Sequence, residues 1–166
     1  MDDLIISKRS IAARKRWARY REKIFDEARE HFDRSGNDPL LIGGVALYWG
    51  EGDSKPTNPL RLSNTDARMI ALYVEFLRVI MGIPDEKIRI GLVLYPDLSD
   101  GICKSFWSGI MGLPIENFMK TQFIKGHHPT KRLAHGVCMV VVNNRAAKLK
   151  VLAWIDFFAK QYTINR

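Results

Sequence analysis

The stretch that decides the fold runs from Asp38 to Gly52 and reads DPLLIGGVALYWGEG. Its start is typical of a helix, because Asp38 is a favoured N-cap residue and Pro39 suits the first helical position. Gly52 predicts the helix end, as a residue that tolerates a left-handed backbone after the last turn. The sequence therefore predicts one helix between these two ends.

The interior of this helix contains residues that are unfavourable unless a tertiary contact compensates for them. Gly43, Gly44 and Gly50 each cost about 1 kcal/mol relative to alanine in a helix. Gly43, Ala46 and Gly50 recur at i, i+3 and i+7, so they share one face. Because small residues let another helix backbone approach closely, we expect a close helix pair on this face.

Glu51 lies at the predicted C-terminus, where the helix dipole disfavours a carboxylate by about 0.3–1 kcal/mol. If the partner helix comes from a second copy, two Glu51 carboxylates and two negative helix ends converge. A hard divalent cation with oxygen ligands would balance that charge. The alternative is a core helix with a solvent-exposed terminal glutamate, and the pattern alone leaves both interpretations open.

Residues 44–52 resemble the signature helix of the LAGLIDADG homing endonucleases, in which small and apolar residues lead to an acid followed by glycine. The matching positions are Ala46 and Gly50 for the small residues, Leu47 for the apolar one and Glu51 for the metal-binding acid. Trp49 and Asp53 depart from the pattern, because an acidic residue and a small residue often stand there.

The resemblance implies a homodimer bound to double-stranded DNA and to Mg²⁺ or another divalent cation such as Mn²⁺. The metal would be held by Glu51 and Gly50. The implied dimer interface consists of Gly43, Ala46, Leu47 and Gly50.

Two further catalytic residues follow from the resemblance. Asn64 matches a polar residue at the end of the second core strand that positions the attacking water, and it is equally a good helix N-cap. Arg145, or Lys148 as second choice, is nearest to the basic residue ahead of the final helix that stabilises the transition state. Arg145 could equally be a surface residue near a helix start.

Composition is consistent with one domain plus an appendage, because 166 residues with 46% hydrophobic content can bury one sizeable core. Lysine and arginine number 26 against 18 acids, a net charge of +8, which favours nucleic acid over a membrane. Cys103 and Cys138 stand alone, so neither a disulfide framework nor a zinc ribbon is predicted. We expect a protein of the cytoplasm or an organellar matrix, not secreted, with no membrane partner and no small-molecule cofactor.

A helix is predicted from Ser10 to about Phe32, because apolar residues recur there every three or four positions. Its first half is strongly basic and its second half acidic. We divide the chain into a basic arm, residues 1–36, and a LAGLIDADG-like domain, residues 37–166. The alternative is a solvated helix with an ordinary charged face. The arm residues expected on DNA are Lys15, Arg16 and Arg19.

The remaining pattern is α+β, with strands over residues 60–63, 87–95 and 136–142 among helices. The resemblance spans about residues 38–160 and implies an antiparallel, saddle-shaped sheet backed by helices, with the helix near 99–112 as an insertion. Residues 76–88 and 106–118 repeat a helix end, a glycine, a proline turn and a strand entry, which we interpret as reused turn chemistry.

Basic and polar side chains on the outward-facing side of the strands and in the segment after residue 117 are expected to contact DNA. The alternative for these residues is a solvated sheet face. His127 and His128 lack metal-ligand spacing and are interpreted as part of a basic loop near DNA. The expected contact residues are Arg61, Ser63, Lys87, Arg89, Lys120, Gln122, Lys125, Lys131 and Arg132.

Together these features predict a divalent-metal-dependent, site-specific double-strand DNA endonuclease of the kind associated with intron or intein mobility. One motif in one chain implies a homodimer on a long, roughly palindromic site. Two alternatives stay open: a DNA-binding regulator that has lost cleavage, and an RNA-binding helper of intron splicing.

Overall fold

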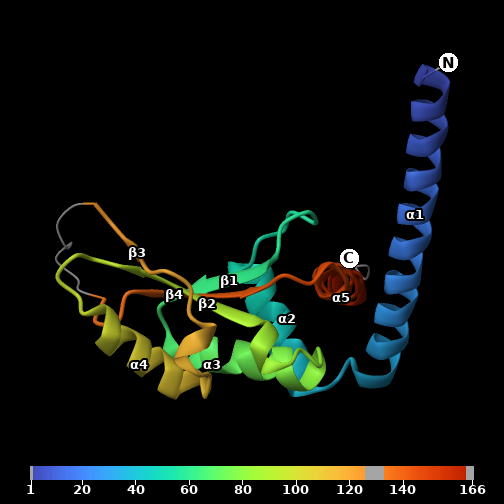
Figure 1. The fold of residues 1–166 in the computed structure, drawn as a ribbon. Coiled ribbons are helices and arrows are strands. Elements are labelled where there is room, and N and C mark those ends of the chain that lie inside the picture. Colours follow the sequence, from blue (N-terminus) through green and yellow to red (C-terminus); the bar gives the residue numbers. More distant parts are fainter. Residues whose placement is uncertain (1, 126–132, 164–166) are drawn as a thin grey trace.

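The computed structural model of the chain describes residues 2–125 and 133–163. Within these residues, five α-helices and a four-stranded mixed sheet form an α+β fold, as the sequence predicts. Helices α2, α3 and α4 lie on one side of the sheet, and α1 stands beside α5 (Figure 1). The elements are α1 Asp2–Ser35, α2 Pro39–Glu51, β1 Leu60–Asn64, α3 Ala67–Glu75, β2 Ile88–Leu94, α4 Asp100–Met111, β3 Gln122–Phe123, β4 Val137–Val142 and α5 Arg145–Thr163.

The sheet has the strand order β1-β4-β2-β3. Strand β4 pairs antiparallel with both β1 and β2, whereas β3 runs parallel to β2. The fully antiparallel sheet implied by the resemblance is therefore wrong at the β3 edge. The physical reason is α4, which carries the chain from β2 back to the same end of the sheet, as a parallel neighbour requires. The helix expected as an insertion thus changes the sheet topology.

One face of the sheet is apolar and buried, as the alternation of apolar and polar residues in the strands predicts. Leu60 and Leu62 of β1 are fully buried, while Arg61 between them is exposed. The same parity holds on the neighbouring strands, because successive side chains point to opposite faces. The buried residues of β2 and β4 that complete this face are Ile88, Ile90, Leu92, Leu94, Cys138, Val140 and Val142.

The internal repeat is reused turn chemistry, as predicted. Gly82 and Gly112 adopt positive φ angles of 61° and 63°, where glycine is favoured, and each follows a helical segment. Each is followed by a proline and a 3-10 turn that leads toward the sheet. The buried side-chain amide of Asn117, in the second copy, donates to two backbone carbonyl oxygens of the first copy at 2.6 and 2.9 Å. The two turns are therefore held together.

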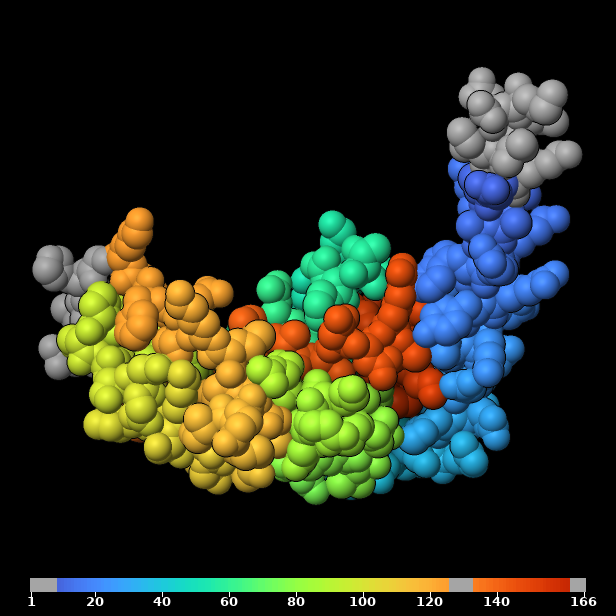
Figure 2. Space-filling view, in the orientation of Figure 1, coloured from blue at the N-terminus to red at the C-terminus, as the bar shows by residue number. Residues whose placement is uncertain are grey.

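Helix α1 is longer than the predicted residues 10–32 and docks along α5 through its second half. Ile24 and Ala28 are buried there, and the Trp154 indole N–H donates to the Ala28 carbonyl oxygen at 2.9 Å. The first half of α1 projects past the body, away from the layer of α2, α3 and α4 (Figure 1). In the space-filling view, the part of this half that follows residue 8 stands clear of the sheet and of α2, α3 and α4 (Figure 2).

Two tryptophans are among the core residues. Trp107 and Trp154 are each 1% exposed, so both pack inside the fold and do not present a ring for stacking on bases. The two cysteines are buried free thiols, and burial raises the pKa of Cys138 to about 12. In the described part of the chain, no helix has the length and apolar character needed to cross a membrane.

Candidate acidic site and nucleic-acid interface

Helix α2 begins as predicted. The Asp38 carboxylate accepts hydrogen bonds from the backbone N–H groups of Leu40 and Leu41 at 2.7 and 3.2 Å. The prediction for its end is wrong in detail, because Gly52 has a φ of −91° and is not left-handed. Glycine is needed there for another reason: a Cβ at Gly52 would lie 2.4 Å from the carbonyl oxygen of Tyr48.

The glycines of α2 serve two different purposes. A Cβ on Gly44 would lie 2.1 Å from Cγ of Phe76, so Gly44 allows a close contact within the chain itself. A Cβ on Gly50 would meet nothing within 4 Å, and Ala46 is exposed. Packing within the chain therefore explains Gly44 but not Gly50.

The expected dimer face is an open surface of the single chain. A Cβ on Gly43 would meet only the Leu72 side chain of α3, at 3.5 Å, and Leu72 is itself 39% exposed. Around these residues the surface forms a shallow apolar depression of about 460 Å³ between α2 and α3. Its lining residues are Gly43, Ala46, Leu47, Arg68, Met69 and Leu72.

Glu51 is exposed at the last turn of α2. Within the described residues, no group of three or more histidine, cysteine, aspartate or glutamate side chains could hold a metal. Mg²⁺ does not need such a cage, because it usually keeps several waters and takes one or two carboxylates plus phosphate oxygens. The Glu51 carboxylate and the Gly50 carbonyl, in a turn whose last carbonyls lack helical donors, are suitable oxygen ligands. These residues fit a metal shared with a second copy and a phosphate.

The carboxylate of Asp53, two residues beyond Glu51, is engaged by the chain itself. It accepts hydrogen bonds from the Asn58 side-chain amide at 2.6 Å and the backbone N–H of Lys55 at 2.8 Å. Arg61 lies 3.4 Å from the same carboxylate. These hydrogen bonds, first that from Asn58, lower the pKa of Asp53. Asp53 therefore shapes the loop after Glu51.

A buried lysine lies behind this loop. The Lys148 ammonium is fully buried and donates to the Tyr48 hydroxyl at 2.5 Å and to the Asp53 carbonyl oxygen. The Tyr48 hydroxyl also donates to that carbonyl, at 2.7 Å. Burial lowers the pKa of Lys148 and raises that of Tyr48 to about 12. The available sequence signal was a lysine at a core position of α5, between buried Ala147 and Val151.

Of the two basic candidates at the start of α5, the structure places Lys148 beside the end of α2. Arg145 is the first residue of α5 and is exposed, with its guanidinium carbon 3.8 Å from the ring centroid of Trp17 on α1. The predicted preference for Arg145 over Lys148 is therefore not supported by the contacts of the two residues. Arg145 contacts the arm, and Lys148 contacts the loop that follows Glu51.

Asn64 lies at the end of β1, as expected, but its role as a helix N-cap is wrong. The N-cap of α3 is Asp66, whose carboxylate accepts from the Arg68 N–H at 2.8 Å. The Asn64 side-chain oxygen instead accepts from the backbone N–H groups of Thr65 and Asp66 at 2.8 and 2.9 Å. This turn fixes the side chain through its oxygen.

The outer face of the sheet brings Arg61 and Arg89 together. Both are exposed and both are paired in register with Val141 of β4, so they flank it on the same face. Ser63 is likewise in register with Met139. Other exposed residues among those expected on DNA are Lys87, Lys120, Gln122 and Lys125, with Lys15, Arg16 and Arg19 on α1. Lys131 and Arg132, with His127 and His128, lie outside the described residues.

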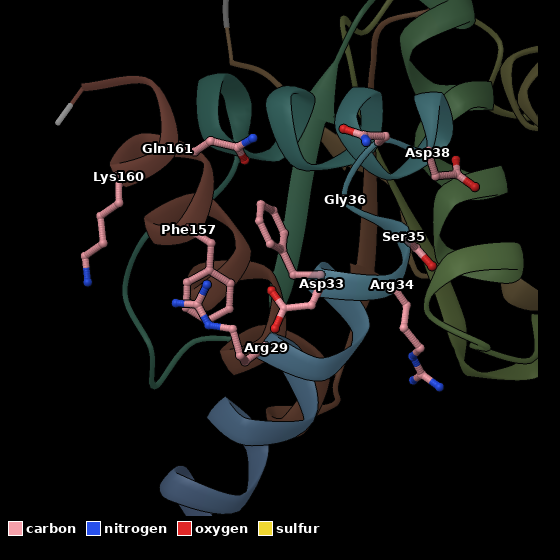
Figure 3. Close-up of a pocket in the computed structure, with 11 residues that line it drawn as sticks. Arg29, Asp33, Arg34, Ser35, Gly36, Asp38, Phe157, Lys160 and Gln161 are labelled. Carbon is pink, nitrogen blue, oxygen red and sulfur yellow. The ribbon is translucent and has the colours of Figure 1, made fainter. Parts of the chain in front are cut away.

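A separate cavity of about 740 Å³ lies where α1, α5 and the turn before α2 meet (Figure 3). The Arg29 guanidinium carbon is 3.6 Å from the ring centroid of Phe157 in its wall. Asp33, Arg34 and Lys160 also line it, so charges of both signs are mixed there. It contains none of the residues expected to act on DNA.

No family model, no curated protein and no solved structure matches this chain.

Proposed function

We propose that the protein is a homodimeric DNA endonuclease that hydrolyses phosphodiester bonds with divalent cations. The observation that carries this proposal is the exposed Glu51 carboxylate, at the end of a helix whose small-residue face is open to solvent. Two copies joined through that face would place two such carboxylates near one symmetry axis.

The proposed interface has physical support in the single chain. Gly50 costs helix stability and meets nothing that would require a glycine within its own chain. The apolar depression beside it exposes Leu72 next to Gly43 and Ala46. A second α2 helix would cover these side chains and give the missing reason for the glycine.

In the proposed site, Glu51 and the Gly50 carbonyl of each copy would hold Mg²⁺ or Mn²⁺ beside the scissile phosphate. A metal bound there would activate water and stabilise the leaving oxygen. Asn64 would orient the attacking water through its side-chain nitrogen, because its oxygen is occupied by the backbone turn. Lys148 would hold the loop after Glu51 in place, through the Asp53 carbonyl.

The outer sheet face supports DNA as the substrate. Arg61 and Arg89 flank Val141 on this face, and arginine fits guanine edges and phosphates by paired hydrogen bonds. The net charge of +8 favours a polyanion in addition. We propose that this arrangement derives from the LAGLIDADG endonuclease family, which the sequence of α2 resembles.

The test uses Glu51→Gln, which keeps the size of the side chain and removes its charge. Targets are first selected by cleavage of a randomised duplex library in Mg²⁺. The variant is expected to lose cleavage and to keep DNA binding, measured in Ca²⁺ so that the unaltered protein does not cut. Full cutting by the variant would refute the metal role of Glu51.

Two other results would redirect the proposal. Duplex binding without cutting by the unaltered protein would identify a DNA-binding regulator. Tighter binding of structured RNA than of duplex DNA would identify an RNA-binding helper. The two are separated by direct competition between the nucleic acids.

A further inference from the structure

The projecting half of α1 is a strongly charged surface that the proposed cutting site does not use. Residues 9–16 are all exposed, and Trp17, which follows them, contacts Arg145 of α5. The backbone from Asp2 to Arg16 extends roughly 22 Å at 1.5 Å per residue. This arm is long enough to follow a nucleic acid outside the sheet.

The direction of the arm is fixed, because its other half is firmly docked. Arg145 stacks on Trp17, and Lys150 forms an ion pair with Glu27 at 2.8 Å. This contact with Lys150 lowers the pKa of Glu27. The arm is a continuation of the same helix, so its orientation is set by α5 and it needs no ordering on binding.

Residues 9–19 contain five basic residues and no acidic residue. Lys15 and Arg19 are spaced i, i+4, and Arg16 and Arg19 are spaced i, i+3, so like charges are neighbours on the helix surface. Each such pair destabilises a helix by about 0.2–0.5 kcal/mol unless an anion neutralises it. None of these three side chains forms an ion pair with another described residue. A polyanionic partner would relieve this repulsion.

The geometry points to DNA phosphates as that partner. The arm projects away from the layer of α2, α3 and α4, toward the side where the outer sheet face lies (Figures 1 and 2). A duplex carries one charge per 1.7 Å, so the arm would pass about 13 phosphate charges. Ile11 is a large exposed apolar residue among residues 9–16, but one such side chain gives little area for insertion into a membrane.

We propose that the projecting half of α1 is a phosphate-binding arm that contacts DNA flanking the segment on the sheet. This proposal rests on the proposed function only because both require DNA as the ligand. The arm would add affinity without base specificity, because phosphate contacts carry no sequence information. It would also lengthen the protected DNA on the outer side of each bound copy.

The test compares two double variants of the full chain that remove the same charge. Lys15→Gln/Arg16→Gln alters the arm, and Arg34→Gln/Lys160→Gln alters the cavity at the docked end of α1 (Figure 3). Affinity for a random-sequence DNA duplex is measured by fluorescence anisotropy across a range of KCl concentrations, without divalent metal. Circular dichroism checks that both variants keep the helix.

In the arm variant, the slope of log affinity against log salt concentration is expected to become shallower by about 2, because each lost phosphate contact removes about 0.9 from it. The control variant is expected to leave the slope unchanged. Equal changes in both variants, or none in the arm variant, would overturn the proposal. So would loss of binding to anionic lipid vesicles by the arm variant with DNA binding unchanged.

These outcomes are independent of cleavage. If the arm variant changes the salt slope and the unaltered protein never cuts DNA, the arm proposal is supported and the endonuclease proposal fails. If cutting is observed and the slope is unaffected, the endonuclease stands and the arm proposal fails.

Discussion

The Lys148 ammonium donates a hydrogen bond to the backbone carbonyl oxygen of Asp53, although the two residues are 95 positions apart in the chain. This contact joins the first turns of α5 to the loop that follows Glu51. The ammonium also lies near the C-terminus of α2, where the helix dipole is negative and a cation is favoured. The placement of the proposed metal-binding acid therefore depends on α5.

The Tyr48 hydroxyl belongs to this hydrogen-bond cluster, and its raised pKa predicts a loss of stability at high pH. Burial raises its pKa from 10.0 to about 12. Between these values the unfolded chain releases the phenol proton and the folded chain keeps it, so stability falls as pH rises. We expect the free energy of unfolding to fall by up to about 2 kcal/mol across this window.

Denaturant unfolding at a series of pH values, with Tyr48→Phe as the comparison, tests this prediction. The variant should show a smaller decline than the unaltered protein. Tyr73, whose pKa burial also raises, contributes with the same sign in both proteins. Parallel pH profiles would show that Tyr48 is not the group responsible.

The two kinds of glycine in α2 predict opposite results for alanine substitution. The methyl group of Gly50→Ala would meet no atom of the described residues within 4 Å, so the substitution should stabilise the monomer by up to about 1 kcal/mol. It should weaken the dimer, because the added methyl group separates the packed helices. Gly44→Ala should destabilise each chain by about 1–3 kcal/mol through its clash with Phe76.

Sedimentation equilibrium measures the dimer, and denaturant unfolding of the two variants measures the chain. A dimer constant unaffected by Gly50→Ala would exclude this helix face from the interface. A well-folded monomer for the unaltered protein at micromolar concentration would remove the homodimer from the proposal.

Arg61 and Arg89 are predicted to contact the duplex. Replacing either with alanine should weaken binding, by about 1–3 kcal/mol and for particular sites only if the side chain reads a base. Lys104→Ala is the control, because Lys104 lies on α4 behind the sheet and pairs with Asp100 at 2.8 Å. Binding titrations at several salt concentrations measure the effect. Unchanged affinity and salt slope in both arginine variants would remove the sheet from the interface.

Asn64→Asp separates the structural and catalytic roles of this side chain. The substitution keeps an oxygen to accept from the N–H groups of Thr65 and Asp66, so stability should change by less than about 0.5 kcal/mol. It removes the side-chain N–H donor proposed to orient water, so the rate of DNA cleavage should fall. Single-turnover cleavage and thermal unfolding distinguish the roles. Normal cleavage would assign Asn64 to the turn alone.

Much of the fold was predictable because its determinants act over a few residues. The cap at Asp38, the alternation around Arg61 and Arg89, and the repeated glycine–proline turns each depend on local backbone preferences and on the period of apolar residues. The position of Glu51 at a helix end followed from the same pattern.

The candidate site was predictable only in part. Glu51, Gly50 and Asn64 lie at element ends that the sequence marks, so their places were expected. The ranking of Arg145 above Lys148 had no local signal to support it, because the two residues differ by three positions on one helix and their surroundings come from α1 and α2, far away in sequence.

By itself, the sequence determined the α+β class, the element order, the buried face of the strands and a helix that ends in an acid. Only the tertiary structure decided that β3 runs parallel to β2 and that Lys148 is buried against Asp53. It also decided that Gly44 leaves room for the ring of Phe76, while the position of a Cβ on Gly50 faces open space. The physical reason is the separation along the chain over which each kind of interaction acts. Helix caps and hydrophobic periodicity act between near neighbours, whereas close packing and buried hydrogen bonds depend on which distant segments meet.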